Sequence, residues 1–354
     1  MKKIKIGLLG AWEEEHARRY AELIETNGQC AFPKKGWKRS EYPGCSLEVV
    51  WDEDSEKCTQ LARELNCRKA ESSDEILQDP KVDAVIICAA TVQHGEFITR
   101  AAEAGKHIFV EKAPFASLED AYRARAAIKR SGVQFMIGSP LKKPRNRYPL
   151  QVAASGKLGT ITEVRFRMYS NLALKDTPSS VFDREKAGGG VLIDLGHHGM
   201  RIISEALGAP VRASAKVGYV SEYAKKYGVE DTAIAVYEFA GGAIGVVEVG
   251  WTSVNDAKEL DIYGTGGRIH VDNDTVSCSY EGGNMLEVPE EEMPEVVDLP
   301  LREWIENIQT DKTDDTIVDQ AVLWTEMLAA AYRAKDGGGA VVWPRPAQGK
   351  VCLY

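Results

Sequence analysis

The sequence lacks the features that mark nucleic-acid-binding, membrane and disulfide-rich proteins. It carries no excess of basic residues: the net charge is −9 and the isoelectric point is near 5.4. Such an acidic chain has no electrostatic attraction for nucleic acid or an anionic membrane surface. Its seven cysteines are odd in number and include no C-x-x-C pair, a pattern typical of reduced thiols. These absences favour chemistry on a small molecule.

Long apolar runs are missing as well. The first run, Ile4–Leu9, is too short for the core of a signal peptide, because the charged stretch that begins at Glu13 soon follows it. No later run reaches the ~20 residues that span a membrane. We therefore expect a cytoplasmic protein that contacts neither a membrane nor nucleic acid.

The chain shows no internal repeat, and at 354 residues it is too long for one ordinary globular unit. Short apolar runs alternate with helical patterns in the first third, which is typical of a parallel sheet covered on both faces. Half-apolar strands then follow in series, as in an antiparallel sheet with helices on one face. We predict an α/β protein with a doubly wound parallel sheet of the Rossmann type in residues 1–138. Residues 139–354 are expected to form an α+β domain, with a large, mostly antiparallel sheet, for substrate binding and oligomerisation.

The chain opens with the pattern of a dinucleotide-binding βαβ unit, in which an apolar strand ends at a glycine and a helix follows. Gly10 matches the first glycine of G-x-G-x-x-G, but Trp12 and Glu15 occupy the other two positions. Acidic residues in a first helical turn are also favoured by the helix dipole, so this stretch alone leaves dinucleotide binding open. If NAD binds, we expect the amides of Ala11–Glu13 to meet its pyrophosphate, with the side chains turned away.

A carboxylate at the end of the second strand is the next element of such a unit. Asp52 stands there and is expected to hydrogen-bond the ribose 2′-hydroxyl. It lies beyond the usual spacing because residues 28–45 form an insertion, which we interpret as a surface loop rather than a lid. Glu53 follows, where an NADP site would need a cation, so NAD is expected to be preferred over NADP.

The stretch "AATVQHGEFITRAAEAGKHIFVEKAPFASLEDA" closely resembles the Gfo/Idh/MocA oxidoreductase family. In that pattern a strand ends in a small-Thr-Pro-x-x-His-like turn. Thr91 and His94 match this turn, with a valine in place of its proline. Glu111 and Lys112 match the Glu-Lys pair that follows the next strand, with an alanine inserted before the proline.

Two later stretches extend the resemblance over essentially the whole chain. "GGGVLIDLGHHGMRII" is similar to the family's glycine-rich D-x-x-x-H helix start, with Asp194 and His198, and "YGTGGRI" is similar to a turn of its C-terminal sheet. The resemblance implies an NAD-binding Rossmann domain and a protein that forms dimers or tetramers. The residues expected at the cofactor are Gly10, Ala11, Trp12, Glu13, Asp52, Ala90, Thr91, His94, Glu111 and Lys112.

Oxidation of a secondary alcohol with NAD requires a base for the hydroxyl proton. A histidine titrates in the appropriate range, and Asp194 and His198, four residues apart, face the same side of a helix. Lys112 stands at the carboxyl end of a parallel strand, where such sheets bind ligands. The resemblance implies the same roles, with His198 as the base and Lys112 and Asp194 as orienting partners.

Two further residues are candidate substrate contacts. His197 adjoins His198 but leaves the helix about 100° away, so it is expected to contact the substrate at most. Lys142 belongs to a basic cluster near the expected domain boundary. We predict no metal site, because Asp194 and the two histidines have no further well-spaced ligand.

The sequence favours an NAD-dependent oxidoreductase that acts on a ring hydroxyl of a sugar, cyclitol or glycoside. One alternative is a redox-neutral enzyme, in which tightly held NAD serves epimerisation or glycoside cleavage. Another is a sugar-sensing protein that has lost cofactor binding through Trp12 and Glu15. We expect self-association through the C-terminal sheet, where "AIGVVEVGW" and "ITEVRFRMYS" offer apolar and aromatic groups for an isologous contact.

Overall fold

The computed structural model describes residues 3–12, 14–25, 44–138, 144–176, 179–294, 300–337 and 341–342. The chain divides into two compact units: the first contains residues 1–142 and 296–322, and the second contains residues 143–295 and 323–354. Residues 296–322, which the sequence analysis places in the C-terminal domain, thus belong to the first unit. The expected insertion at 28–45 lies almost wholly outside the described residues.

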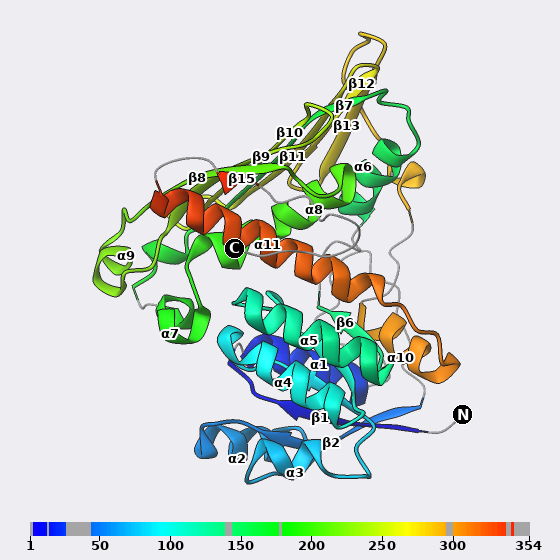
Figure 1. Ribbon diagram of the computed structural model, residues 1–354, viewed down its shortest axis with the longest axis vertical. Helices are drawn as coiled ribbons and strands as arrows, with labels where there is room; N and C mark the ends of the chain where they lie inside the picture. The colour runs from blue at the N-terminus through cyan, green and yellow to red at the C-terminus, as the bar shows by residue number, and fades with distance from the viewer. Residues whose placement is uncertain are drawn as a thin grey trace. The chain divides into compact units, whose positions relative to one another are not determined.

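The first unit contains a six-stranded parallel sheet in the order β3-β2-β1-β4-β5-β6 (Figure 1). All four residues of β4 are buried, as expected for a strand covered on both faces. The strand order reverses direction between β1 and β4, and ligands bind parallel sheets at such switch points. The strands are β1 Ile4–Leu9, β2 Cys45–Trp51, β3 Arg68–Lys69, β4 Ala84–Ile87, β5 His107–Val110 and β6 Phe135–Ile137.

Helices from both parts of the first unit cover this sheet. Apolar residues of α1, α2 and α10 join one hydrophobic cluster with β1. Trp304 of α10 is fully buried, and its ring centroid lies 5.6 Å from that of Phe109 on β5. The returning segment therefore completes the core. The helices are α1 Glu14–Glu25, α2 Ser55–Glu64, α3 Ser73–Leu77, the 3₁₀ turn η1 Thr91–Gln93, α4 His94–Glu103, α5 Leu118–Ser131 and α10 Pro300–Thr310.

The second unit contains a nine-stranded sheet in the order β14-β13-β12-β11-β7-β10-β9-β8-β15. Its strands pair antiparallel except β7 with β10, which pair parallel. The two sheets confirm the predicted α/β fold class. The strands are β7 Ile161–Tyr169, β8 Arg212–Gly218, β9 Thr232–Glu238, β10 Ile244–Gly250, β11 Ala257–Gly264, β12 Gly267–Asp272, β13 Thr275–Tyr280, β14 Leu286–Glu287 and β15 Val341–Val342.

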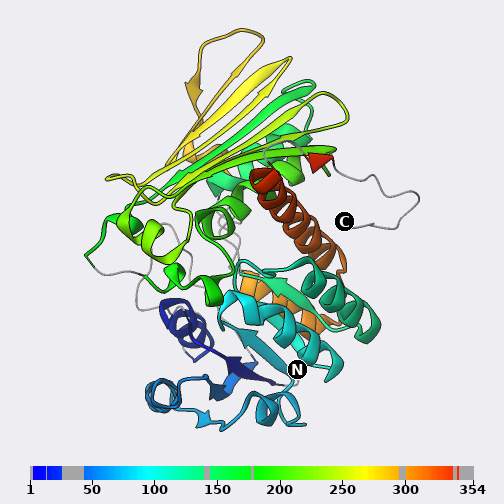
Figure 2. The same ribbon diagram turned by 60° about the vertical axis from the view of Figure 1, so that its left-hand side comes forward.

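One face of this sheet packs on α8 and on the second half of α11 (Figure 2). A Cβ at Gly199 of α8 would lie 2.6 Å from the Phe166 ring of β7 and 2.9 Å from Val247 of β10, so the helix approaches this closely only with glycine. The helical segments are α6 Pro144–Ala154, η3 Leu172–Leu174, η4 Ser180–Phe182, α7 Arg184–Ala187, the π turn η5 Leu192–Gly196, α8 His197–Leu207, α9 Glu222–Tyr227, η6 Glu290–Glu292 and α11 Thr316–Gly337. None of the helices in the described ranges is long and apolar enough to cross a bilayer.

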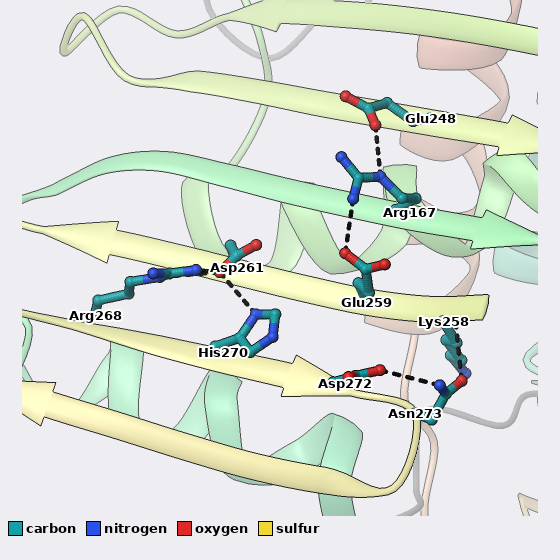
Figure 3. A network of polar contacts seen from close by, with 9 residues as sticks. All are labelled: Arg167, Glu248, Lys258, Glu259, Asp261, Arg268, His270, Asp272 and Asn273. Atoms are coloured by element: carbon teal, nitrogen blue, oxygen red, sulfur yellow. Dashed lines mark hydrogen bonds and ion pairs between the residues drawn. The ribbon is translucent and has the colours of Figure 1, made fainter. Parts of the chain in front are cut away.

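The opposite face of the nine-stranded sheet, the open face, carries ion pairs between neighbouring strands (Figure 3). Arg167 of β7 lies between two carboxylates, with Nε 2.8 Å from Glu248 and Nη1 2.7 Å from Glu259. On the next strands, Asp261 accepts hydrogen bonds from Arg268 at 2.6 Å and from His270 at 2.9 Å. The open face is therefore strongly charged along β10, β7, β11 and β12.

Of the apolar and aromatic groups expected at a contact surface on these strands, the largest face the helices instead. Phe166 and Trp251, which come from the two quoted stretches, are 1% and 0% exposed and point to the helical side. Successive side chains of a strand point to opposite faces of the sheet, so the arginines of β7 lie on the open face. The apolar side chains exposed there include Ile234 at 47% and Ile244 at 42%.

Candidate active site

The turn after β1 brings three strand ends together. Gly10 has φ +79°, and a Cβ there would lie 2.5 Å from Ala89 Cα and 2.7 Å from Ala89 Cβ. Its N–H donates to the Trp51 carbonyl at 2.7 Å, and the Trp12 N–H donates to the Cys88 carbonyl at 2.9 Å. The one glycine that the fingerprint retains is thus the one whose position requires glycine.

We expect Gly10→Ala to lower the free energy of unfolding by about 2–4 kcal/mol, because left-handed backbone strain adds to overpacking against Ala89. NAD affinity should fall with it. Urea unfolding and calorimetric titration with NAD measure the two effects.

Gly105→Ala is the matched control. Gly105 also has a positive φ, +70°, but a Cβ added there would meet no atom within 4 Å. The free energy of unfolding of this variant should fall only by the left-handed backbone strain, which is about 1–2 kcal/mol. Equal losses in the two variants would contradict the steric argument.

Asp52, at the end of β2, is tied to the protein backbone. It is 8% exposed. Its Oδ2 accepts the Ala11 N–H at 2.7 Å and its Oδ1 accepts the Asp54 N–H at 2.9 Å. Glu53 differs, because it is exposed and accepts a hydrogen bond from Gln93 Nε2 at 3.3 Å. The carboxylate expected at the ribose therefore anchors the loop after β1, and its neighbour is the accessible one.

The start of α1 is the remaining anion-binding element of this unit. The amides of Ala11 and Trp12 already donate to Asp52 and Cys88, which differs from their expected role at the pyrophosphate. First-turn amides of a helix have no intrahelical acceptor, and in α1 these begin at Glu14. Glu13 lies outside the described residues.

The acidic side chain at this helix start is neutralised by cations. Glu14 lies 3.1 Å from Arg18 Nη2 and 3.4 Å from Lys57 Nζ. The Arg18 hydrogen bond lowers the pKa of Glu14 by more than burial raises it, and the charge of Lys57 lowers it further. The negative charge of Glu14 is thereby paired within the protein.

His94 joins the ends of two neighbouring strands. It is 1% exposed, with Nδ1 2.8 Å from the Ala113 carbonyl and Nε2 2.9 Å from the Ala89 carbonyl. Thr91 and Ala90 are buried in the turn before it. The Lys112–Ala113 peptide bond is cis, so the inserted alanine occupies the cis position of this turn. His94 therefore holds the loop that carries Lys112.

Glu111 lies directly before Lys112 and is surrounded by donors. The Tyr20 hydroxyl donates to Oε1, His16 Nδ1 lies 3.5 Å from Oε2, and the Lys112 N–H donates to Oε2 at 3.0 Å. Burial alone would raise the pKa of Glu111, but His16, Tyr20 and Lys112 outweigh it and hold the pKa at about 2. A Cβ at Gly138 would lie 2.7 Å from Oε1. This carboxylate, expected at the cofactor, is thus enclosed by protein groups.

The candidate residues of the second unit follow a glycine run. A Cβ at Gly190 would lie 2.1 Å from the Glu230 carbonyl oxygen. The Gly190 N–H donates to Glu230 Oε1 at 3.0 Å, and the Tyr332 hydroxyl donates to the same oxygen at 2.7 Å. Glu230 is 3% exposed. These contacts fix the chain where the π turn η5 begins.

Asp194 lies in that π turn, a local geometry frequent at functional sites. Its N–H donates to the Gly190 carbonyl at 3.1 Å, and its Oδ2 accepts the indole N–H of Trp251 at 3.2 Å. Trp251 follows β10 and is fully buried. The sequence analysis missed this residue, because the order of residues along the chain gives no sign that it reaches Asp194.

His197 and His198 begin α8 and lie against each other. They are 6% and 8% exposed, and their ring centroids are 4.0 Å apart. His197 Nδ1 lies 3.0 Å from the Ile193 carbonyl. The two rings therefore lie side by side, which differs from the divergence expected from helical spacing.

The candidate residues thus form two groups. Lys112 belongs to the first unit with the Gly10 turn, and Asp194, His197 and His198 belong to the second. Lys142 lies outside the described residues. Within the described ranges, no group of three or more His, Cys, Asp or Glu side chains is arranged to hold a metal ion.

Comparison with protein families matches both parts of the chain. Residues 4–139 match the model described as oxidoreductase family, NAD-binding Rossmann fold. Residues 150–270 match the model of the GFO/IDH/MocA C-terminal domain.

Individual relatives of known name are also oxidoreductases, in agreement with the family match. The chain is 33% identical over 234 residues, 65% of this chain and 67% of the relative, to a scyllo-inositol 2-dehydrogenase (NAD(+)) of Bacillus subtilis. It is 28% identical over 231 residues, 64% of this chain and 68% of the relative, to a myo-inositol 2-dehydrogenase of Thermotoga maritima. Levoglucosan dehydrogenase in complex with NADH and levoglucosan superimposes with a TM-score of 0.82 at 18% identity, over 97% of this chain and 100% of that one, which shows a shared fold.

Proposed function

Because the chain belongs to the GFO/IDH/MocA family of NAD-binding oxidoreductases, we propose that it oxidises a ring hydroxyl of a cyclitol or sugar with NAD. Inositol dehydrogenases among its relatives support this substrate class. The observation that carries the proposal is the second unit's arrangement of Asp194, held by Trp251, one helical turn before His198.

The residues of the first unit fit NAD. The Gly10 turn leaves no room for a side chain, and the first-turn amides of α1 suit the pyrophosphate. We assign the ribose hydroxyls to the accessible Glu53, because both oxygens of Asp52 accept backbone N–H groups. A carboxylate at this position repels a 2′-phosphate, so NAD is preferred to NADP.

The chemistry follows from the groups in each unit. Bound NAD supplies the hydride acceptor. The His198 imidazole takes the proton of the reacting hydroxyl, and the Asp194 carboxylate stabilises the imidazolium that forms. The Lys112 ammonium donates a hydrogen bond to the substrate oxygen, while Glu111 and His94 hold the loop from which it extends.

A substrate screen tests this proposal. Inositols, hexoses and simple glycosides are incubated with the protein and either NAD or NADP, and NADH absorbance is followed. We expect net reduction with at least one cyclitol or sugar and a lower KM for NAD than for NADP. Substrate conversion without net NADH would instead indicate the redox-neutral reaction, and the absence of NAD binding in calorimetry would indicate a sensing protein.

The cysteines fit a reducing compartment, and we propose that the protein is cytoplasmic. Cys58 and Cys278 are free thiols. Free thiols persist where glutathione and thioredoxin keep them reduced.

We also propose that the protein self-associates through the open face. Ile234 of β9 and Ile244 of β10 expose apolar side chains there, beside the arginines and carboxylates around Arg167. A two-fold axis would pair positive with negative groups of a second copy. Sedimentation at micromolar concentration is expected to give a dimer or tetramer. Ile234→Arg should shift it toward the monomer and the control Val254→Arg, at a position 77% exposed, should not, whereas a wild-type monomer would contradict the proposal.

A further inference from the structure

The geometry points to Trp251 as the residue that positions Asp194 for proton transfer, an inference that rests on the proposed function. Its indole N–H donates to Asp194 Oδ2 at 3.2 Å. The proposed partner of the other carboxylate oxygen, Oδ1, is His198, which follows four residues later in the chain. Trp251 is a positioning residue in this scheme, since it acts through the carboxylate and not on substrate.

The indole is held firmly enough for this role. Trp251 is fully buried. Its N–H on the main chain donates to the Asp231 carbonyl at 2.8 Å, and its own carbonyl accepts the Ala173 N–H at 2.9 Å. The Phe182 ring meets the indole edge to face at 5.2 Å. Because backbone and ring are both fixed, the N–H has one direction in which to donate.

A buried donor gives a carboxylate an orientation that water does not provide. A hydrogen bond to a charged group is stronger than one between neutral groups, and the half-buried Asp194 carboxylate loses a fixed donor when the indole N–H is removed. The backbone of Asp194 is fixed as well, because its N–H donates to the Gly190 carbonyl at 3.1 Å. With the main chain and one oxygen both held, the indole selects which carboxylate oxygen faces the base.

Trp251→Phe removes the N–H and keeps an aromatic ring for Phe182. We expect kcat to fall by about tenfold, the change typical of one lost hydrogen bond to a charged group. NAD affinity should stay within about twofold, because Trp251 belongs to the unit that lacks the Gly10 turn. Stopped-flow or steady-state turnover and calorimetry give the two numbers.

The chain contains a matched control. Trp324 is also buried, and its indole N–H donates to Ser204 Oγ at 3.1 Å in the same unit. Trp324→Phe therefore removes a comparable buried hydrogen bond that does not reach Asp194. It should lower stability, since a buried hydrogen bond is lost, while kcat remains near the wild-type value.

An NMR measurement tests the contact without any substrate. In ¹⁵N-labelled full-length protein, the Trp251 indole resonance, identified by its loss in Trp251→Phe, should shift in Asp194→Asn while the Trp324 resonance does not. The His198 imidazole signals should shift in Trp251→Phe and remain in place in Trp324→Phe.

These readouts separate the role of Trp251 from the proposed function. If no cyclitol or sugar is oxidised, the function fails, and the His198 signals alone decide the role of Trp251. If the Trp251 indole resonance does not shift in Asp194→Asn, the inference is overturned. It is also overturned if Trp251→Phe and the wild type have the same kcat.

Discussion

Replacing His198 by alanine is expected to lower kcat by about 10²–10⁴-fold, the usual effect of losing a general base. The affinity for NAD should remain nearly unchanged, because the Gly10 turn and the α1 amides belong to the other unit. Turnover of the wild type should rise with pH until the imidazole is neutral and able to accept a proton. Single-turnover kinetics with an identified substrate, together with calorimetry, measure these effects.

Two further variants define the roles around His198. Lys112→Ala should reduce kcat to a similar extent and should also weaken substrate binding, because it removes a donor to the substrate oxygen. His197→Ala should have a milder effect, since it removes only the ring that packs 4.0 Å from His198. Wild-type turnover in His198→Ala would make the base assignment wrong and would leave His197 or a lysine as the next candidate.

The second large effect is expected in stability. The pKa of Glu111 is about 2 in the folded protein, against 4.5 for the ordinary group. A lowered folded-state pKa stabilises the protein fully above the unfolded value, and this stabilisation is lost as the pH falls from about 4.5 to about 2. Glu111→Gln should therefore lower the free energy of unfolding by about 3 kcal/mol at pH 7. The difference from wild type should shrink at pH 3.

Urea unfolding at the two pH values measures this difference. Glu119→Gln is the control, because Glu119 is exposed in the first turn of α5 and its loss should cost less than about 1 kcal/mol. A difference that is the same at pH 7 and pH 3 would contradict the assignment of the effect to the ionised Glu111. Activity should fall together with stability, since one of the two oxygens that accept hydrogen bonds from Tyr20 and the Lys112 N–H becomes an amide NH2 group.

The two sheets could be predicted because the sequence patterns that indicate their strands are local. Near-continuous apolar strands such as Ala84–Ile87 and alternating ones such as Thr232–Glu238 give the burial directly. The role of Gly10 could be predicted for the same reason, since a turn after an apolar strand requires a positive φ. The matching of Asp194 with His198 rests on the order of several motifs along the chain.

The direction in which individual side chains point was harder to predict from the sequence. Asp52 and Glu53 are adjacent acids, and which of them turns to backbone amides depends on the position of the β1 loop in space. Glu111 likewise meets Tyr20 and His16, which are about 90 residues earlier in the chain. A π turn has no simple sequence periodicity, so the approach of His197 to His198 was not predictable from helical spacing.

The return of residues 296–322 to the first unit has a consequence for how this protein is made. Trp304 fills the core beside Phe109, so the N-terminal sheet cannot complete its core until α10 has left the ribosome. At about 5–20 residues per second, synthesis takes tens of seconds to travel from β6 to α10. Throughout that interval, apolar surface around Phe109 stays uncovered on the nascent chain. The first unit to be translated therefore completes its core only after most of the second unit has been made, and a fragment truncated after β6 would leave the apolar surface around Phe109 exposed.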